Sequence, residues 1–252
     1  MARNVVLAEI HTIRRLDIEF LGVSGGHFVA IYVASFGDMP TNTKKVLSMR
    51  AFNGGKNMIL DVSSYQGKID WKKVSSQDVS KVILRSTVKS GNLDGRLMEN
   101  YNGILQNMND KLKGLDFYKF SYCRDYVSAR IECKKTIDEM TKHGIKLEVM
   151  DYFFLDLEAW GGRDYFKNEA NEVIMAYEDE CENIGITLGL YSNYNYLKNI
   201  IDPVWRFLPL WYARYNSFMG DIKPFDAIYW QYTSKGHVDG IEGNVDISRE
   251  VI

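Results

Sequence analysis

Short apolar runs alternate with longer amphipathic segments from Met58 to the end of the chain. The runs have the length and the β-branched and aromatic content of buried strands, and strands separated by helical segments are typical of a parallel sheet covered by helices. Eight runs are predicted to be strands: MILDVS from Met58, VILRST from Val82, FYKFSY from Phe117, YFFLDLE from Tyr152, LGLYSN from Leu188, PLWYARY from Pro209, AIYWQYT from Ala227 and NVDIS from Asn244.

Three segments between these runs carry apolar residues at helical spacing. They are GRLMENYNGILQNMNDKL from Gly95, VSARIECKKTIDEMTKH from Val127 and YFKNEANEVIMAYEDECENI from Tyr165. Gly144 and Gly185 follow the second and third segments, where glycine is the preferred residue for ending a helix. The later connections are shorter and less helical. We therefore expect an α/β fold, an irregular TIM-like (β/α) barrel with about eight strands and fewer, unequal helices.

Polar and aromatic residues gather at the carboxyl ends of the predicted strands. They are Asp61, Ser63, Tyr122, Asp156, Glu158, Tyr191, Ser192, Tyr215, Gln231 and Asp246. In a parallel barrel these ends open onto one face, where active sites are found. We therefore expect these side chains to meet at one end of the barrel.

The strongest local signal for chemistry is the pair Asp156 and Glu158 within FLDLE. Carboxylates two apart on a strand point to the same face, with Cα atoms roughly 6.6 Å apart. Two ionised groups at that distance repel, so one tends to keep its proton toward neutral pH. A protonated acid beside a carboxylate is the arrangement that glycosidic cleavage requires. A solvated edge strand is the alternative interpretation, but the apolar neighbours Leu155 and Leu157 favour a buried strand.

Two further acids, Asp61 and Asp246, lie within apolar runs. An Asp in a buried strand is costly unless it is paired or functional. Hydrogen bonding to a loop would explain either residue singly. Together with Asp156 and Glu158 they predict a shared acidic pocket, which we expect to be a groove open at both ends.

Aromatic residues are concentrated in the second half of the chain, and flat rings with polar tips stack on sugars. About half of these rings are expected to belong to the barrel wall. The candidates for substrate binding are Tyr122, Tyr191, Trp211, Tyr215 and Gln231. Because alternate strand residues face opposite ways, a Gln231 that points into the pocket would place Trp230 and Tyr232 outside it.

Charge and composition argue against several other classes of protein. Residues 1–57 hold seven Lys and Arg against four Asp and Glu, and the remaining chain is net acidic, which gives no footprint for nucleic acid. The three cysteines lack CxxC spacing and the four histidines form no ligand pair, so we expect core thiols, no metal and no cofactor. The apolar stretch over residues 20–36 is too short and too interrupted for a membrane span.

Six motifs in order make residues 58–252 resemble the family 25 glycoside hydrolases, the Chalaropsis-type lysozymes of bacteria, fungi and phage endolysins. They are DVSSYQGKIDW over 61–71, FYKFSY over 117–122, FFLDLE over 153–158, LGLYSN over 188–193, LPLWYARY over 208–215 and YWQYTSKGHVDGIEGNVDIS over 229–248. The sequence departs from the family pattern at Asp116, where a Gly is common, at Ser248, where an Asn is common, and in lacking a Pro before the fourth strand.

The resemblance implies a lysozyme (N-acetylmuramidase) that hydrolyses the β-1,4 bond between N-acetylmuramic acid and N-acetylglucosamine in bacterial peptidoglycan. It places the catalytic acid at Glu158 and its partner at Asp156, with Asp61 and Asp246 as the accompanying acids. Direct displacement and substrate-assisted attack by the 2-acetamido group are both compatible, and we favour the second. The implied location is extracellular or, for a phage enzyme, the host cytoplasm with release to the cell wall.

Two alternatives to an active lysozyme were considered. Chitinase-like barrels also present an acid on the fourth strand, within a DxxDxDxE signature, but this signature is not met here because Phe154 stands where it requires its second Asp. A barrel that has lost activity and only binds wall glycans would usually lack the proton donor, whereas Glu158 is present.

Residues 1–57 match nothing in the family, and their structure is not defined by the sequence. We expect an N-terminal extension, either dispensable or absent from a native product that begins at Met58, followed by a catalytic domain over 58–252. A small accessory domain is the alternative, because VVLAEIHTIRRLDIEFLG and HFVAIYVASFG contain strand-like stretches.

Overall fold

The computed structural model describes residues 16–24, 27–34, 58–108, 112, 114–159, 161–215 and 225–251. The chain divides into two compact units, Met1–Gly55 and Lys56–Ile252. In the first unit, strands β1 (Leu16–Ser24) and β2 (His27–Ala34) form an antiparallel hairpin. The strand-like stretches of this unit therefore pair with each other, and the other residues of 1–57 lie outside the described part.

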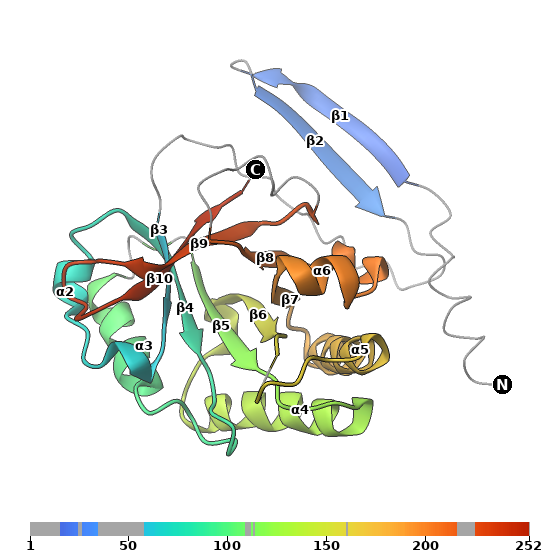
Figure 1. The fold of residues 1–252 in the computed structure, drawn as a ribbon. Helices are drawn as coiled ribbons and strands as arrows, with labels where there is room; N and C mark the ends of the chain where they lie inside the picture. The colour runs from blue at the N-terminus through green and yellow to red at the C-terminus, as the bar shows by residue number, and fades with distance from the viewer. Residues whose placement is uncertain are drawn as a thin grey trace. The chain divides into compact units, whose positions relative to one another are not determined.

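The second unit is a closed barrel of eight strands (Figure 1). The strands are β3 (Met58–Val62), β4 (Val79–Arg85), β5 (Gly114–Phe120), β6 (Met150–Asp156), β7 (Leu188–Asn193), β8 (Leu210–Ala213), β9 (Tyr229–Gly236) and β10 (Val245–Glu250). Each of the eight apolar runs overlaps one of them, so the predicted α/β barrel is confirmed. Strands β3 to β9 are parallel to their neighbours in chain order, and β10 closes the barrel between β9 and β3.

The expectation that every strand brings its carboxyl end to the same face is wrong for the last strand. Strand β10 is antiparallel to both β9 and β3. The eight residues between β9 and β10 are too few for the crossover that a parallel strand requires, which takes a dozen or more residues. Asp246 therefore lies at the beginning of its strand, yet it reaches the same end of the barrel as the carboxyl ends of the other strands.

Long helices follow β4, β5 and β6 only, as the uneven pattern of the sequence predicts. They are α3 (Leu97–Asn107), α4 (Tyr126–Lys142) and α5 (Lys167–Ile184). Shorter elements are α2 (Trp71–Val74), α6 (Tyr194–Asn199) and the 3-10 turns Ser64–Gln66, Leu147–Val149 and Pro203–Phe207. Within the described ranges, every helix is too short or too polar to span a bilayer.

The boundaries of the two longest helices have local causes. The Asp125 side chain accepts a hydrogen bond from the Ser128 backbone N–H and caps the first turn of α4. Gly185 ends α5 in the left-handed conformation, with a φ of 81°, which costs glycine nothing. Gly144 has a φ of 89° directly after α4. The predicted glycine stops are therefore confirmed.

Alternation along the strands produces two apolar layers. On β6, Phe153 and Leu155 face outward into the large core between strands and helices, whereas Phe154 faces the barrel interior. The interior layer is small and mostly aromatic: Ile59, Ile83, Phe154, Tyr191, Trp211, Ala213 and Tyr229. Cys133 of α4 and Cys181 of α5 lie in the outer core, as expected of core thiols.

An ion pair fills the amino-terminal end of the barrel interior. The Lys81 ammonium lies 3.1 Å from a carboxylate oxygen of Asp116 and 2.6 Å from one of Asp151. The Tyr152 backbone N–H donates to Asp116, and the Tyr229 hydroxyl also donates to it. Burial raises the pKa of Asp116 to about 6, while Lys81 opposes the rise. Asp116, one of the departures from the family pattern, is thus a paired structural residue.

Candidate active site

The four predicted catalytic acids meet at the other end of the barrel, which we call the mouth. Asp61 is the last but one residue of β3 and lies directly opposite Asp246 in the β10 register, and Asp156 is the last residue of β6. Glu158 follows Asp156 in an extended segment. That segment is held to β7 because the Leu157 N–H donates to the Tyr191 carbonyl (3.0 Å) and the Ser192 hydroxyl donates to the Leu157 carbonyl (2.6 Å).

Burial, with neighbouring acids in three of the four cases, raises the proton affinity of the four carboxyl groups. Burial, followed by the charge of Asp246, raises the pKa of Asp61 well above its usual value. Burial also raises the pKa of Asp246. For Asp156 the causes of a pKa well above its usual value are burial, then the charges of Glu158 and Asp61. The mouth therefore holds protons at a pH where exposed carboxyl groups would be ionised.

Asp156 and Glu158 form a coupled pair within this cluster. Burial raises the pKa of Glu158 as well, but hydrogen bonds with Asp156 and Asn193 oppose that rise. Asp156 is buried and its Oδ1 atom has no hydrogen-bond partner among the described residues, whereas Glu158 is only half-buried. The two carboxyl groups therefore titrate as a pair that retains a proton above the usual carboxyl range, and Glu158 is its more accessible member.

Gln231 connects the two sides of the mouth. Its side-chain oxygen accepts hydrogen bonds of 2.9 Å from the hydroxyls of both Tyr191 and Tyr215. Its amide nitrogen lies 3.4 Å from Asp61 and 3.5 Å from Asp246, with each carboxylate as acceptor. Gln231 is completely buried, so this network fixes its orientation.

The strand carrying Gln231 has the alternation that the sequence predicts. Its neighbours Trp230 and Tyr232 lie on the outer face, where both rings contact the Arg249 guanidinium, at 4.3 and 5.7 Å from their centroids. The polar side chain of this strand points into the barrel and its two rings point out.

The remaining predicted substrate-binding residues differ in accessibility. The Tyr215 side chain is 56% exposed and Tyr122 is half-buried, so both rings offer surface to a ligand. Trp211 does not, because only 1% of it is exposed. Its indole N–H donates to the Ser248 hydroxyl at 2.9 Å, and its ring packs 4.4 Å from that of Tyr191. Trp211 therefore packs beneath the site, and its role as a substrate contact stays a prediction.

Sequence reasoning missed a second set of residues at the mouth. Arg85 ends β4, and its guanidinium is bound to Asp94 and to the Ser64 hydroxyl (2.9 Å). The ring of Tyr65 lies over this guanidinium, 4.8 Å from ring centroid to carbon, and is 84% exposed. A hydrogen bond with Tyr118 opposes the raised pKa of Asp61. The position of Arg85 at the end of the apolar run VILR is the sequence feature that could have identified it as a site residue.

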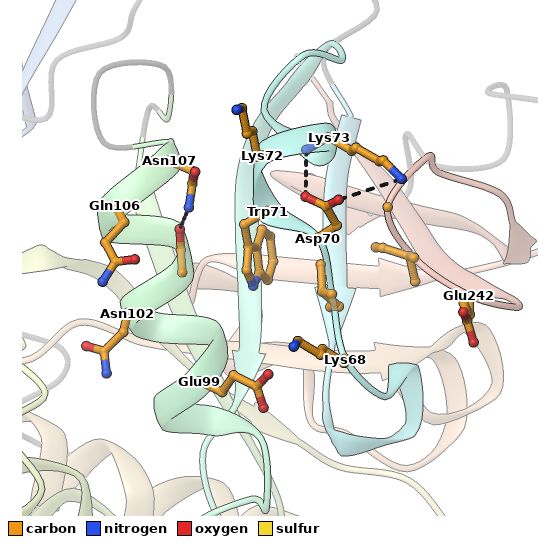
Figure 2. Close-up of a pocket in the computed structure, with 14 residues that line it drawn as sticks. Lys68, Asp70, Trp71, Lys72, Lys73, Glu99, Asn102, Gln106, Asn107 and Glu242 are labelled. Carbon is orange, nitrogen blue, oxygen red and sulfur yellow. Dashed lines mark hydrogen bonds and ion pairs between the residues drawn. The ribbon is translucent and has the colours of Figure 1, made fainter.

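A hollow on the described surface lies elsewhere. It measures about 830 Å³ and is formed by α2, α3 and the loop around residue 241 (Figure 2). Glu99, Asn102 and Gln106 of α3 line one side, with Lys68 and Glu242 across from them. It contains none of the predicted site residues. The mouth, where the coupled acids lie, remains the candidate active site, and the open groove there stays a prediction.

A (β/α) barrel with coupled carboxyl groups at its mouth is the architecture of a glycoside hydrolase that works by acid catalysis. The sequence profile of the glycosyl hydrolases family 25 matches residues 60–241, and the chain belongs to that family. Family membership confirms the resemblance carried by the six motifs.

Two bacterial wall-lytic proteins are similar to this chain. The chain is 28% identical over 191 residues to the autolytic lysozyme of Clostridium acetobutylicum, covering 75% of this chain and 54% of that protein. It is 25% identical to the modular autolysin LytC of Streptococcus pneumoniae, with a TM-score of 0.65, covering 76% of this chain and 46% of that one. The chain thus spans about half the length of these two relatives.

A phage enzyme shares the fold over nearly its whole length. The catalytic domain of endolysin ply40, from bacteriophage P40 of Listeria monocytogenes, superposes with a TM-score of 0.62 at 22% identity. The superposition covers 79% of this chain and 95% of that domain.

Proposed function

We propose that this protein is a lysozyme that hydrolyses the β-1,4 bond between N-acetylmuramic acid and N-acetylglucosamine in bacterial peptidoglycan. The observation that carries the proposal is the Asp156–Glu158 pair, which retains a proton above the usual carboxyl range at the open end of a family 25 barrel. The lysozyme and autolysin relatives support it, and a structure of LytC has been described in complex with a synthetic peptidoglycan ligand.

Glu158 is the general acid in this proposal. It gives its proton to the glycosidic oxygen as the bond from that oxygen to C1 of N-acetylmuramic acid breaks, so the departing sugar leaves as a neutral alcohol. The carbonyl oxygen of the 2-acetamido group attacks C1 and forms a cyclic intermediate. Water then adds at C1 and returns a proton to Glu158, which restores the acid and releases the new reducing end.

Asp156 orients the 2-acetamido group and stabilises the positive charge that develops beside it. Its carboxyl group is held in place by burial and by the neighbouring carboxyl of Glu158. Asp61 and Asp246 are two further carboxyl groups at the same mouth, and the buried Gln231 amide fixes both. Fixed charge at the position where the sugar becomes cationic favours the transition state over the ground state.

The exposed rings of Tyr215 and Tyr65 offer flat apolar surfaces at the mouth, and the partly exposed ring of Tyr122 adds a third. Rings of this kind stack on sugar faces. Because the substrate is part of the cell wall, we propose that the enzyme acts outside the cell that produces it, or on a host wall after release from an infected cytoplasm.

The test is the incubation of the purified protein with purified cell walls, followed by turbidity and by mass spectrometry of the new reducing ends. A muramidase leaves N-acetylmuramic acid at those ends. Reducing N-acetylglucosamine would contradict the proposed bond, and sedimentation with walls without any new ends would favour the alternative of a glycan-binding barrel.

A further inference from the structure

The turn after β3 carries Tyr65, the most exposed large apolar side chain among the described residues, at 84%. The backbone of this turn is nevertheless fixed. The Ser63 hydroxyl accepts a hydrogen bond of 3.3 Å from the Tyr65 N–H, and the Gln66 side-chain oxygen accepts one of 2.8 Å from the Ser63 N–H. The Gln66 amide also donates to the Asn244 carbonyl, in the loop before β10, at 3.4 Å. Tyr65 is therefore an exposed ring on a turn that is held in place.

Arg85 supports this ring from beneath. The carbon of its guanidinium lies 4.8 Å from the centroid of the Tyr65 ring, a contact that stabilises a ring against a cation. Its Nε donates to Asp94 at 2.7 Å, and a second guanidinium nitrogen donates to the same carboxylate and to the Ser64 hydroxyl at 2.9 Å. Asp94 is buried, so these bonds hold the guanidinium still and balance its charge. Arg85 is thus a fixed support for Tyr65.

The strand register places both residues at the mouth. Ile83 of β4 faces the barrel interior and pairs with Asp61 of β3. Arg85 follows Ile83 by two residues, so it points to the same side and lies nearer the carboxyl end of the strand. It therefore stands beside Asp61 at the open end of the barrel. The Tyr65 ring, which covers Arg85, borders the mouth on the side of β3 and β4.

The ring is separated from the coupled acids by more than one sugar. Asp156 ends β6, and β6 is two strands away from β4 in the barrel. Because neighbouring strands lie about 5 Å apart, Arg85 and Asp156 are roughly 10 Å apart across the sheet. This separation exceeds the length of a single sugar ring. A sugar stacked on Tyr65 is therefore another residue of the glycan strand than the one at Asp156 and Glu158.

We propose that the Tyr65 ring binds a sugar distant from the cleaved bond, and that Arg85 is the positioning residue of this ring. The inference rests on the proposed function, because that sugar belongs to the glycan strand that the mouth would cleave. Flat rings with polar tips stack on the apolar faces of sugars. A ring that is already held in place loses little conformational freedom when the sugar arrives. Long glycan strands should therefore bind more tightly than short fragments, and the difference should depend on Tyr65.

The test measures the Kd of two glycan fragments by calorimetry. The fragments are a tetrasaccharide and a decasaccharide of peptidoglycan strands whose peptide stems have been removed. Every chain also carries Glu158→Gln, which prevents cleavage during the measurement. Tyr65→Ala removes the ring, and Tyr65→Trp keeps a ring at the same position. Phe207→Ala is the matched control, because its ring is also exposed but lies shortly before β8, at the amino-terminal end of the barrel.

Tyr65→Ala is expected to weaken decasaccharide binding roughly 3- to 10-fold, the size of a single ring contact, and to weaken tetrasaccharide binding less. Tyr65→Trp should restore most of the loss. Phe207→Ala should bind both fragments like the chain without it. Equal losses on the two fragments, no loss on either, or the same loss in Phe207→Ala would overturn the inference.

The role of Arg85 is tested by a double-variant cycle. Arg85→Lys keeps a positive charge beside Asp94 but removes the planar group beneath the ring. It should reduce the preference for the decasaccharide when Tyr65 is present, and reduce it no further once Tyr65→Ala has been introduced. A purely structural role would weaken both fragments alike and add to the effect of Tyr65→Ala. Either of those results would contradict the positioning of Tyr65 by Arg85.

Failure of the proposed function is recognised separately, because it is read from the wild-type chain as an absence of new reducing ends on cell walls. The binding experiment does not depend on cleavage. A chain that cleaves nothing but loses decasaccharide affinity through Tyr65→Ala would still support the ring as a glycan contact. A chain that cleaves walls but binds both fragments equally well with and without the ring would contradict it.

Discussion

Glu158→Gln is the most informative single change, because it replaces the proposed proton donor by an amide of the same shape. The side chain is half-buried and follows β6 in a segment held by two hydrogen bonds that do not involve its carboxyl group. The amide also removes one titratable group from a cluster of four acids. We therefore expect the fold and the binding of walls to be retained.

The expected loss of activity follows from the role of a general acid, which contributes about 10²- to 10⁴-fold to a rate. In free energy this is about 3–5 kcal/mol of transition-state stabilisation. The loss should appear in kcat, with KM changed little, because the amide still fits the site but has no acidic proton to donate.

Glu148→Gln is the matched control. It makes the same chemical change ten residues earlier, at an exposed position at the opposite end of β6. Both variants should be compared by turbidity of cell walls, by mass spectrometry of reducing ends and by thermal unfolding. Near-normal lysis by Glu158→Gln, or an equal loss in Glu148→Gln, would refute the assignment of the acid.

Three further predictions test the mouth and the domain boundary. Asp156→Asn should reduce kcat severely and move the alkaline limb of the pH–rate profile to lower pH, because Glu158 then loses its proton without the repulsion of a second carboxylate. An unchanged profile would contradict the coupling. Gln231→Met should lower kcat/KM about 10- to 100-fold, the effect of losing hydrogen bonds to charged groups, and wild-type kinetics would contradict its role. A chain beginning at Met58 should fold and lyse walls like the full chain, and an inactive product would make residues 1–57 a required domain.

A fourth prediction concerns stability. A carboxyl group whose pKa is raised by folding binds its proton more tightly when folded, so stability falls as pH rises from the unfolded value of about 4 through the folded pKa. Asp61 is such a group. Asp61→Asn should therefore raise Tm at pH 7, by 2–4 °C for each kcal/mol gained at this chain length, and have little effect at pH 3. A lower Tm at pH 7 would contradict this.

The fold was predictable because its strands are buried on both faces. Phe153, Phe154 and Leu155 of β6 are fully buried, so they form a continuous apolar run that is easily recognised between polar helical segments. The glycines that end α4 and α5 mark their boundaries for an equally local reason. Strand direction is not local: nothing within NVDIS distinguishes an antiparallel strand, and only the short connection before it decides its direction.

The candidate site was predictable to the extent that it depends on alternation along a strand. Asp156 and Glu158 share a side because they are two residues apart, and Gln231 points inward for the same reason. Trp211 also alternates inward, but its depth in the barrel depends on packing against Tyr191 and Ser248, which come from other strands. The position of Tyr65 over Arg85 likewise depends on two loops meeting in space.

Asp61 and Asp116 show why an acid in a buried strand is ambiguous in sequence and clear in structure. Each lies within an apolar run and faces the interior of the same barrel. Asp116 meets Lys81 at 3.1 Å from the neighbouring strand, so its charge is compensated and its role is structural. Asp61 instead faces Asp246, a second acid, across the β10 register. The Gln231 amide and a hydrogen bond with Tyr118 hold the Asp61 carboxyl, but the facing acid disfavours its charged form, which a ligand that brings positive charge would favour, as the proposed sugar substrate does when its glycosidic bond breaks.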